Sequence, residues 1–170
     1  KPNVNAEFVN TDVMYNNLMN DFSFTNTADP EVYYNQNYRN FFLNHRSVYA
    51  SLATSLVQEG QDEKAVEVVD YIMKTISPEA VPMDITGLDF AQVYFATGND
   101  EKGLALVEGM WKDNYELFNY LIDHELPYMS RERQISIAVL SQIVQILRQY
   151  DLNEKALEYQ DEIRVLYEKM

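Results

Sequence analysis

Apolar residues recur with a helical period along most of this chain. Between residues 37 and 59 they follow steps of three and four, as at Tyr49, Leu52, Ala53 and Leu56, which is the spacing of one helical face. Strand signals are absent from the sequence. The pattern predicts three antiparallel helical hairpins: 37–59 with 62–76, 84–97 with 100–124, and 131–150 with 153–168.

The turns inside these hairpins share a repeated motif. Residues 60–66 have the sequence GQDEKAV, residues 98–104 have GNDEKGL, and residues 151–157 have DLNEKAL. Gly60 and Gly98 are predicted at the left-handed position that closes a helix. The third residue of each motif is predicted to be the N-cap of the next helix, and these residues are Asp62, Asp100 and Asn153.

Small residues face each other across the first two turns. Ala53 precedes Ala65 by twelve positions, and Ala91 precedes Gly103 by the same interval. Such pairs let two antiparallel helices approach closely, whereas the third turn combines Ala156 with Val144, so we expect a looser hairpin there. The pattern is typical of tetratricopeptide repeats. The predicted fold class is all-α, a tetratricopeptide-like array of about three hairpins with an N-terminal arm and short helix.

The first part of the chain differs from the rest, because 11 of its 15 Asn residues lie in residues 1–44. Asn has weak helix propensity. We therefore predict that residues 1–36 form an arm, a short helix and a loop that pack on a repeat domain of residues 37–170. Thr11 is predicted to cap a helix over residues 12–20, and Asp29 followed by Pro30 is predicted to start another helix.

Composition narrows the possible classes of partner. Lys and Arg number 13 against 27 Asp and Glu, a formal net charge of −14. Nucleic-acid binding is excluded, because it needs a positively charged face, and anionic membrane surfaces are disfavoured. No stretch is apolar enough for membrane insertion. Zero cysteines exclude disulfides and thiolate metal sites.

The sequence contains no recognisable catalytic motif. Glycines of residues 98–103 resemble a phosphate loop only superficially, since no Gly-Lys-Ser/Thr follows and two acidic residues stand there instead. The two histidines, His45 and His124, lack the spacing of a zinc site. We interpret both as structural residues, and His124 as a side chain at a helix C-terminus. We predict no catalytic residue, no cofactor and no metal.

Aromatic residues cluster where the lead-in meets the first long helix. The cluster consists of Tyr33, Tyr34, Tyr38, Phe41 and Phe42. These side chains either fasten the lead-in onto the first hairpin or form a surface for a sugar or peptide, since tyrosine gives a large contact area at low entropy cost. The first alternative is the simpler one. Burial of the three tyrosines would exclude the second.

Residues 10–66 carry a more specific signal. Residues 10–19 (NTDVMYNNLM), 29–34 (DPEVYY) and 38–40 (YRN), together with the turn at 60–66, resemble the C-terminal soluble part of a family of bacterial multi-spanning membrane proteins. That part was long labelled a domain of unknown function. The membrane portion of this family resembles GT-C glycosyltransferases, whose eukaryotic relatives are protein O-mannosyltransferases.

The resemblance implies a non-catalytic appendage on the periplasmic face of the bacterial inner membrane, as part of a larger protein. The start at Lys1-Pro2 without an initiator Met agrees with that expectation. Its partner would be a protein, a peptide, or the membrane portion of its own parent chain. The resemblance implies that the parent protein is a membrane glycosyltransferase. Two alternatives remain: a free-standing peptide-binding adaptor, expected in the cytoplasm, and a carbohydrate-binding module that uses the aromatic cluster.

Overall fold

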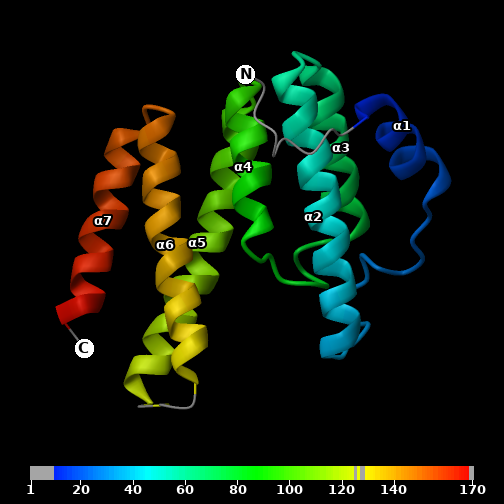
Figure 1. Ribbon diagram of the computed structural model, residues 1–170. Coiled ribbons are helices and arrows are strands. Elements are labelled where there is room, and N and C mark those ends of the chain that lie inside the picture. Colours follow the sequence, from blue (N-terminus) through cyan, green and yellow to red (C-terminus); the bar gives the residue numbers. More distant parts are fainter. Residues whose placement is uncertain (1–9, 125, 127–128, 169–170) are drawn as a thin grey trace, which may run out of the picture. The chain divides into compact units, whose positions relative to one another are not determined.

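The computed structural model describes residues 10–124, 126 and 129–168, and the regular secondary structure of these residues is all helical, without strands (Figure 1). The all-α prediction is thus confirmed. The helices are α1 (Thr11–Asn16), η1 (Asn17–Asp21), α2 (Gln36–Gln58), α3 (Asp62–Thr75), α4 (Thr86–Ala96), α5 (Asp100–Asp123), α6 (Ser130–Gln149) and α7 (Asn153–Glu168).

The chain forms two compact units, Lys1–Gly98 and Asn99–Met170, here called the N-terminal unit and the C-terminal unit. The predicted hairpin of 84–97 with 100–124 falls across this division. Both of its helices are present, as α4 and α5. The predicted boundary between residues 36 and 37 stays a prediction.

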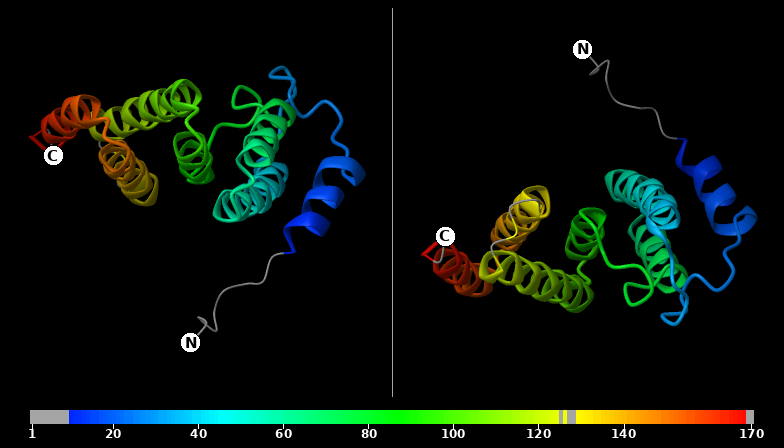
Figure 2. Two further views of the ribbon diagram at one scale, coloured as in Figure 1. Left: turned by 90° about the horizontal axis from the view of Figure 1, so that it is seen from above. Right: turned by 90° about the horizontal axis from the view of Figure 1, so that it is seen from below.

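The N-terminal unit is built around the α2–α3 hairpin. Helix α4 packs against both helices of the hairpin, and α1 packs against α2; both views of Figure 2 show α1 and α4 on opposite sides of the hairpin. The apolar residues named on the predicted helical face of residues 37–59 are fully buried, and so are Ala65 and Val69 of α3. Those of the first helix are Tyr49, Leu52, Ala53 and Leu56.

The C-terminal unit consists of α5, α6 and α7, with α6 packed against both of the others. Helix α6 buries Leu140, Ile143 and Leu147, whereas Ile135 near its start is 50% exposed. Trp111 on α5 stacks on Tyr159 of α7 with ring centroids 3.7 Å apart. Aromatic stacking therefore joins the two outer helices of this unit.

The turns close as predicted, but their caps differ from the prediction. Gly60 and Gly98 both have φ of +72°, and Asp151 takes the same left-handed conformation, with φ of +61°. Asp62, Asp100 and Asn153 are the first helical residues rather than N-caps. The prediction was wrong by one residue because the preceding carbonyl already accepts the first helical hydrogen bond from the motif's small residue. Those bonds are Ala65 to Gln61, Gly103 to Asn99 and Ala156 to Leu152.

The lead-in also departs from the prediction. Asn10, not Thr11, caps α1, because its side-chain oxygen accepts a hydrogen bond from the backbone N–H of Val13 at 3.1 Å. Asp29 and Pro30 start a turn instead of a helix, and α2 begins only after Asn35, whose side chain caps it. The arm was predicted over residues 1–11; its residues 1–9 lie outside the described residues, and Thr11 already belongs to α1.

Candidate functional site

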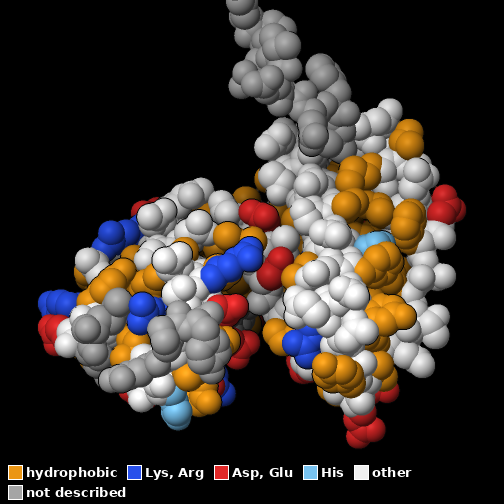
Figure 3. All heavy atoms as spheres, turned by 60° about the horizontal axis from the view of Figure 1, so that its bottom comes forward, with side chains coloured by type: hydrophobic (Ala, Val, Ile, Leu, Met, Phe, Trp, Pro, Cys, Tyr) orange, Lys and Arg blue, Asp and Glu red, His pale blue; other side chains and the backbone are white. Residues whose placement is uncertain are grey.

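The main candidate site is an aromatic pocket of about 570 Å³ in the N-terminal unit. One wall comes from the first turns of α2, and the other from the segment of residues 22–34 that leads to this helix. Figure 3 shows hydrophobic side chains gathered around a histidine side chain at this face. The lining residues are Phe22, Ser23, Phe24, Thr25, Thr27, Tyr34, Asn37, Tyr38, Phe41, Phe42 and His45.

Hydrogen bonds hold the lead-in wall in place. The Thr27 hydroxyl donates to the carbonyl oxygen of Thr75 at the end of α3, and the Ser77 hydroxyl donates to the carbonyl oxygen of Ala28 at 3.2 Å. The Tyr34 hydroxyl donates to the carbonyl oxygen of Asn26 at 2.8 Å. Asn26 has φ of +57°, a conformation that Asn tolerates better than most residues. The middle of the wall is therefore bonded to the end of α3, and the bond from Tyr34 to Asn26 closes the wall on itself.

His45 lies among the rings of the pocket. Its centroid is 4.1 Å from that of Phe41, 5.4 Å from Phe24 and 6.2 Å from Phe22. Its Nδ1 lies 2.9 Å from the carbonyl oxygen of Phe41, one helical turn earlier. A carbonyl only accepts, so Nδ1 is the donor and carries the hydrogen.

The structure brings together four of the five aromatic residues singled out in the sequence. Tyr34, Tyr38, Phe41 and Phe42 line the pocket. Phe42 is 5% exposed and forms its floor, whereas Tyr38 and Phe41 are 60% and 50% exposed. Tyr33 is 82% exposed and lies outside the pocket, 6.0 Å from the Arg39 guanidinium. The three tyrosines are not all buried, so the ligand surface is not excluded. That a ligand binds there stays a prediction.

Three lining residues that carry rings were missed in the sequence, namely Phe22, Phe24 and His45. Phe22 and Phe24 lie in the lead-in loop, where no periodic pattern indicates which surface a side chain will cover. His45 was interpreted as a structural residue. The spacing of four between Phe41 and His45, which places both on one face of a helix, was the available signal.

A buried arginine supports the helix beneath the pocket. Arg46 has no exposed surface and donates to the carbonyl oxygens of Ile76 (2.9 Å), Val81 (2.6 Å) and Pro82 (3.0 Å). These bonds satisfy carbonyls at the C-terminal end of α3 and in the loop that follows. Burial lowers the pKa of Arg46 to about 10, partly opposed by the charge of Asp84. The guanidinium still carries its charge at neutral pH.

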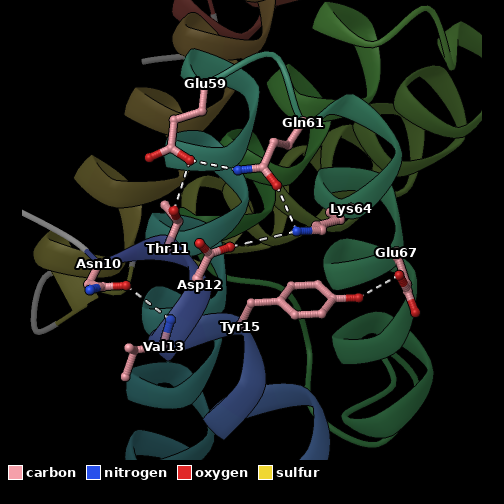
Figure 4. Close-up of polar contacts among 9 residues, drawn as sticks. All are labelled: Asn10, Thr11, Asp12, Val13, Tyr15, Glu59, Gln61, Lys64 and Glu67. Atoms are coloured by element: carbon pink, nitrogen blue, oxygen red, sulfur yellow. Dashed lines mark hydrogen bonds and ion pairs between the residues drawn. The ribbon is translucent and has the colours of Figure 1, made fainter.

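The short helix α1 is fastened to the first turn by side-chain hydrogen bonds (Figure 4). The Thr11 hydroxyl donates to Oε2 of Glu59 at 2.8 Å, and Nε2 of Gln61 donates to the same oxygen at 2.8 Å. Glu59 closes α2 and Gln61 precedes α3. The start of α1 is thereby tied to both ends of the turn.

A second set of contacts joins α1 to α3. Lys64 Nζ lies 3.8 Å from Oδ1 of Asp12 and 5.3 Å from the ring centroid of Tyr15. The Tyr15 hydroxyl donates to Oε2 of Glu67 at 2.6 Å. Burial, together with this hydrogen bond, raises the pKa of Tyr15 to about 12. The lead-in helix thus covers one side of the first hairpin, as capping elements do in repeat arrays.

The C-terminal unit has a polar hollow of about 520 Å³ at its last turn. Lys155 lies at its centre, 3.4 Å from a carboxylate oxygen of Glu108, 3.3 Å from one of Glu158, and 4.8 Å from the ring centroid of Tyr159. These three charged groups already form ion pairs with one another. The hollow therefore offers a ligand fewer groups without a partner than the aromatic pocket does.

Searches for other kinds of site gave negative findings over the described ranges. Within residues 10–124, 126 and 129–168, no three side chains of His, Asp or Glu are grouped so as to hold a metal ion. None of the helices in that part of the chain is long and apolar enough to cross a bilayer.

Comparison with known proteins gave no further assignment. The chain matched no protein-family model, no curated protein and no solved structure.

Proposed function

We propose that this chain is a non-catalytic helical-repeat interaction domain that binds a peptide segment of a partner protein in the aromatic pocket. The observation that carries the proposal is the half-exposed state of Tyr38 and Phe41 beside a pocket of about 570 Å³. Rings exposed at a concave surface mark binding sites, because their burial by a partner is favourable.

The composition of the pocket favours binding over catalysis. Its lining consists of aromatic rings, hydroxyls and one amide, with His45 as its one imidazole. General acid–base or nucleophilic chemistry needs at least a second group that activates or orients the first. Measurable sugar-transfer or hydrolytic turnover by the purified 170-residue chain would contradict the proposal.

The test is selection of peptides from a random library on the immobilised chain, followed by titration of the enriched sequences. We expect Phe41→Ala to weaken their binding at least about tenfold, as for an interface hot spot. Tyr120→Ala is the matched control, because Tyr120 is 53% exposed and lies on the C-terminal unit. Enriched peptides that bind both variants equally well would place peptide binding elsewhere.

A carbohydrate ligand is the second candidate, favoured by the 82% exposure of Tyr33 next to the pocket. Flat exposed tyrosines suit stacking on sugar rings. A glycan screen at millimolar sugar, repeated with Tyr33→Ala, tests this function. If no glycan binds Tyr33→Ala more weakly than it binds the parent chain, the carbohydrate-binding function is wrong.

We also propose that the domain belongs to a larger membrane-bound glycosyltransferase-like protein. The support is the resemblance of residues 10–66 to the soluble part of that family. The reading frame upstream of Lys1 provides the test. Several encoded segments of about 20 apolar residues would agree with it, whereas a short signal peptide, or no preceding segment, would contradict it.

A further inference from the structure

The hydrogen bond of His45 determines which edge of its ring is available to a ligand. Because Nδ1 donates to the carbonyl oxygen of Phe41, the neutral imidazole has its lone pair at Nε2. Within the described residues, Nε2 has no hydrogen-bond partner. The pocket therefore combines aromatic walls with one nitrogen acceptor.

The imidazole is surrounded by rings. Phe41 lies tilted against the imidazole, and Phe24 meets it edge to face at an interplanar angle of 86°. An apolar ligand that covers these rings without a donor would leave Nε2 desolvated and unpaired, which costs free energy. A flat aromatic ligand with an N–H on its edge would satisfy both the rings and the acceptor.

The exposed charges around the pocket are mostly acidic. Asp21, Asp29 and Glu31 are exposed in and beside the lead-in wall. Arg39 opposes them, since its Nε donates to the carbonyl oxygen of the lining residue Tyr34. The N-terminal unit has 5 Lys and Arg against 13 Asp and Glu, and one of these cations, Arg46, is fully buried. Charge complementarity therefore favours a basic partner and disfavours an acidic one.

We infer that the pocket binds a basic peptide segment that inserts one tryptophan side chain, whose indole N–H donates to Nε2 of His45. The indole is flat, large and apolar, and it carries a single donor. The flanking basic residues are attracted by the acidic lead-in. This inference rests on the proposed function, since it names the peptide that the same pocket takes.

The probe is a short synthetic peptide with a central tryptophan, flanked on each side by one glycine and two lysines. Two companions change one property each: phenylalanine replaces tryptophan in the first, and glutamates replace the lysines in the second. Binding to the full 170-residue chain is measured by calorimetry, because Trp111 of the chain itself fluoresces. Each peptide is titrated into the parent chain and four variants.

The variants form two matched pairs. His45→Leu and Phe41→Ala change the pocket. His124→Leu and Tyr120→Ala change the same kind of pair in the C-terminal unit, where Nδ1 of His124 lies 2.9 Å from the Tyr120 carbonyl oxygen. Circular dichroism and thermal melts establish that each variant is folded.

We expect the lysine–tryptophan peptide to bind the parent chain about three- to tenfold more tightly than the phenylalanine peptide. His45→Leu should remove that preference by weakening the tryptophan peptide alone. The glutamate peptide should bind about tenfold more weakly than its lysine counterpart at low salt, and the gap should narrow at about 0.5 M salt. Both C-terminal variants should bind like the parent.

The failures of the two proposals are distinguishable. If all three peptides bind with equal affinity and Phe41→Ala weakens all of them, the pocket is a peptide site but the inferred ligand is wrong. If the preference for tryptophan survives in His45→Leu, the hydrogen bond to Nε2 is wrong. If no peptide responds to Phe41→Ala, the proposed function and the inference both fail.

Discussion

Both units contain a histidine packed against an aromatic ring one helical turn earlier, but the residues around this pair differ. In the N-terminal unit, His45 lies against Phe41, and in the C-terminal unit His124 lies against Tyr120, with ring centroids 4.1 Å apart in both pairs. Phe22 and Phe24 of the lead-in add further rings around His45, whereas Tyr120 is 53% exposed. The pair follows from the helical spacing of four residues, whereas the pocket forms only where the lead-in adds a second wall.

The lysines of the turn motif repeat this contrast. Lys64 lies over Tyr15, which is supplied by α1 some fifty residues away, as the contact between Tyr15 and Glu67 also shows. Lys155 lies over Tyr159, one turn further along its own helix. The same cation–aromatic contact is tertiary in one unit and local in the other. Removing or loosening the lead-in should therefore affect the histidine and lysine contacts of the N-terminal unit and leave those of the C-terminal unit unchanged.

The largest effect is expected from Arg46→Met. The change leaves several buried carbonyls without a donor, and we expect a loss of about 3 kcal/mol in the free energy of unfolding. Arg148→Met is the control in the C-terminal unit, because Arg148 is exposed and bonds to Gln160; it should cost about 0.5 kcal/mol or less. Urea denaturation measures both.

Arg46→Lys sharpens this test, since lysine keeps the charge but lacks the planar fork that reaches several carbonyls. An intermediate loss of stability is expected. If Arg46→Met unfolds at the same urea concentration as the parent, the guanidinium is not what holds the end of α3.

The next largest effect concerns the packing of the two turns. Ala65 and Ala156 both have no exposed surface. Ala65→Leu should overpack the α2–α3 hairpin, where Ala53 lies opposite, and cost about 1–3 kcal/mol. Ala156→Leu should cost less if the α6–α7 hairpin is looser. Thermal melts compare the two, and equal losses would contradict the expected looseness.

A smaller effect is expected at the lead-in wall. Thr27→Val removes the hydroxyl that donates to the carbonyl oxygen of Thr75 while keeping the shape of the side chain. We expect a loss of about 1 kcal/mol and faster proteolysis within residues 22–35. Thr97→Val is the control, because the Thr97 hydroxyl bonds within its own helix, to Val93. Equal proteolysis of both variants would show that Thr27 does not hold the wall.

The smallest effect distinguishes Tyr15 from Tyr159, although both have their pKa raised to about 12, chiefly by burial. A raised tyrosine pKa means that the protonated phenol stabilises the fold. This contribution is complete below the ordinary pKa of 10 and is lost as the pH rises through about 12. With either Tyr→Phe change, the free energy of unfolding should therefore fall less steeply as the pH rises from 10 to about 12.

At neutral pH the two changes should differ. Tyr15→Phe should cost about 0.5 kcal/mol, because the exposed hydrogen bond to Glu67 is lost. Tyr159→Phe should change stability less, since its hydroxyl has no hydrogen-bond partner within the described residues. Urea titrations at pH 7, 10 and 12 measure both effects. If Tyr159→Phe loses more stability at pH 7 than Tyr15→Phe does, the expected order of the two changes is wrong.

The periodic part of the sequence determined most of the fold. The helical faces of α2, α3 and α6 followed from the spacing of their apolar residues, because a helix buries every third or fourth side chain whatever it packs against. The left-handed turn residues followed from Gly60 and Gly98, since glycine alone adopts positive φ without cost. Only the exact caps were misplaced, by one residue, because the carbonyl that accepts the first helical hydrogen bond belongs to the residue before the predicted cap in all three motifs.

The pocket was decided by the tertiary structure. Tyr34, Tyr38, Phe41 and Phe42 were recognisable as a cluster, but nothing local determined that Phe42 would be buried and Tyr33 exposed. Phe22 and Phe24 reach His45 only because Thr27 fastens the lead-in to the end of α3. Such a contact joins residues about fifty positions apart and depends on how both helices already pack, so no sequence period records it.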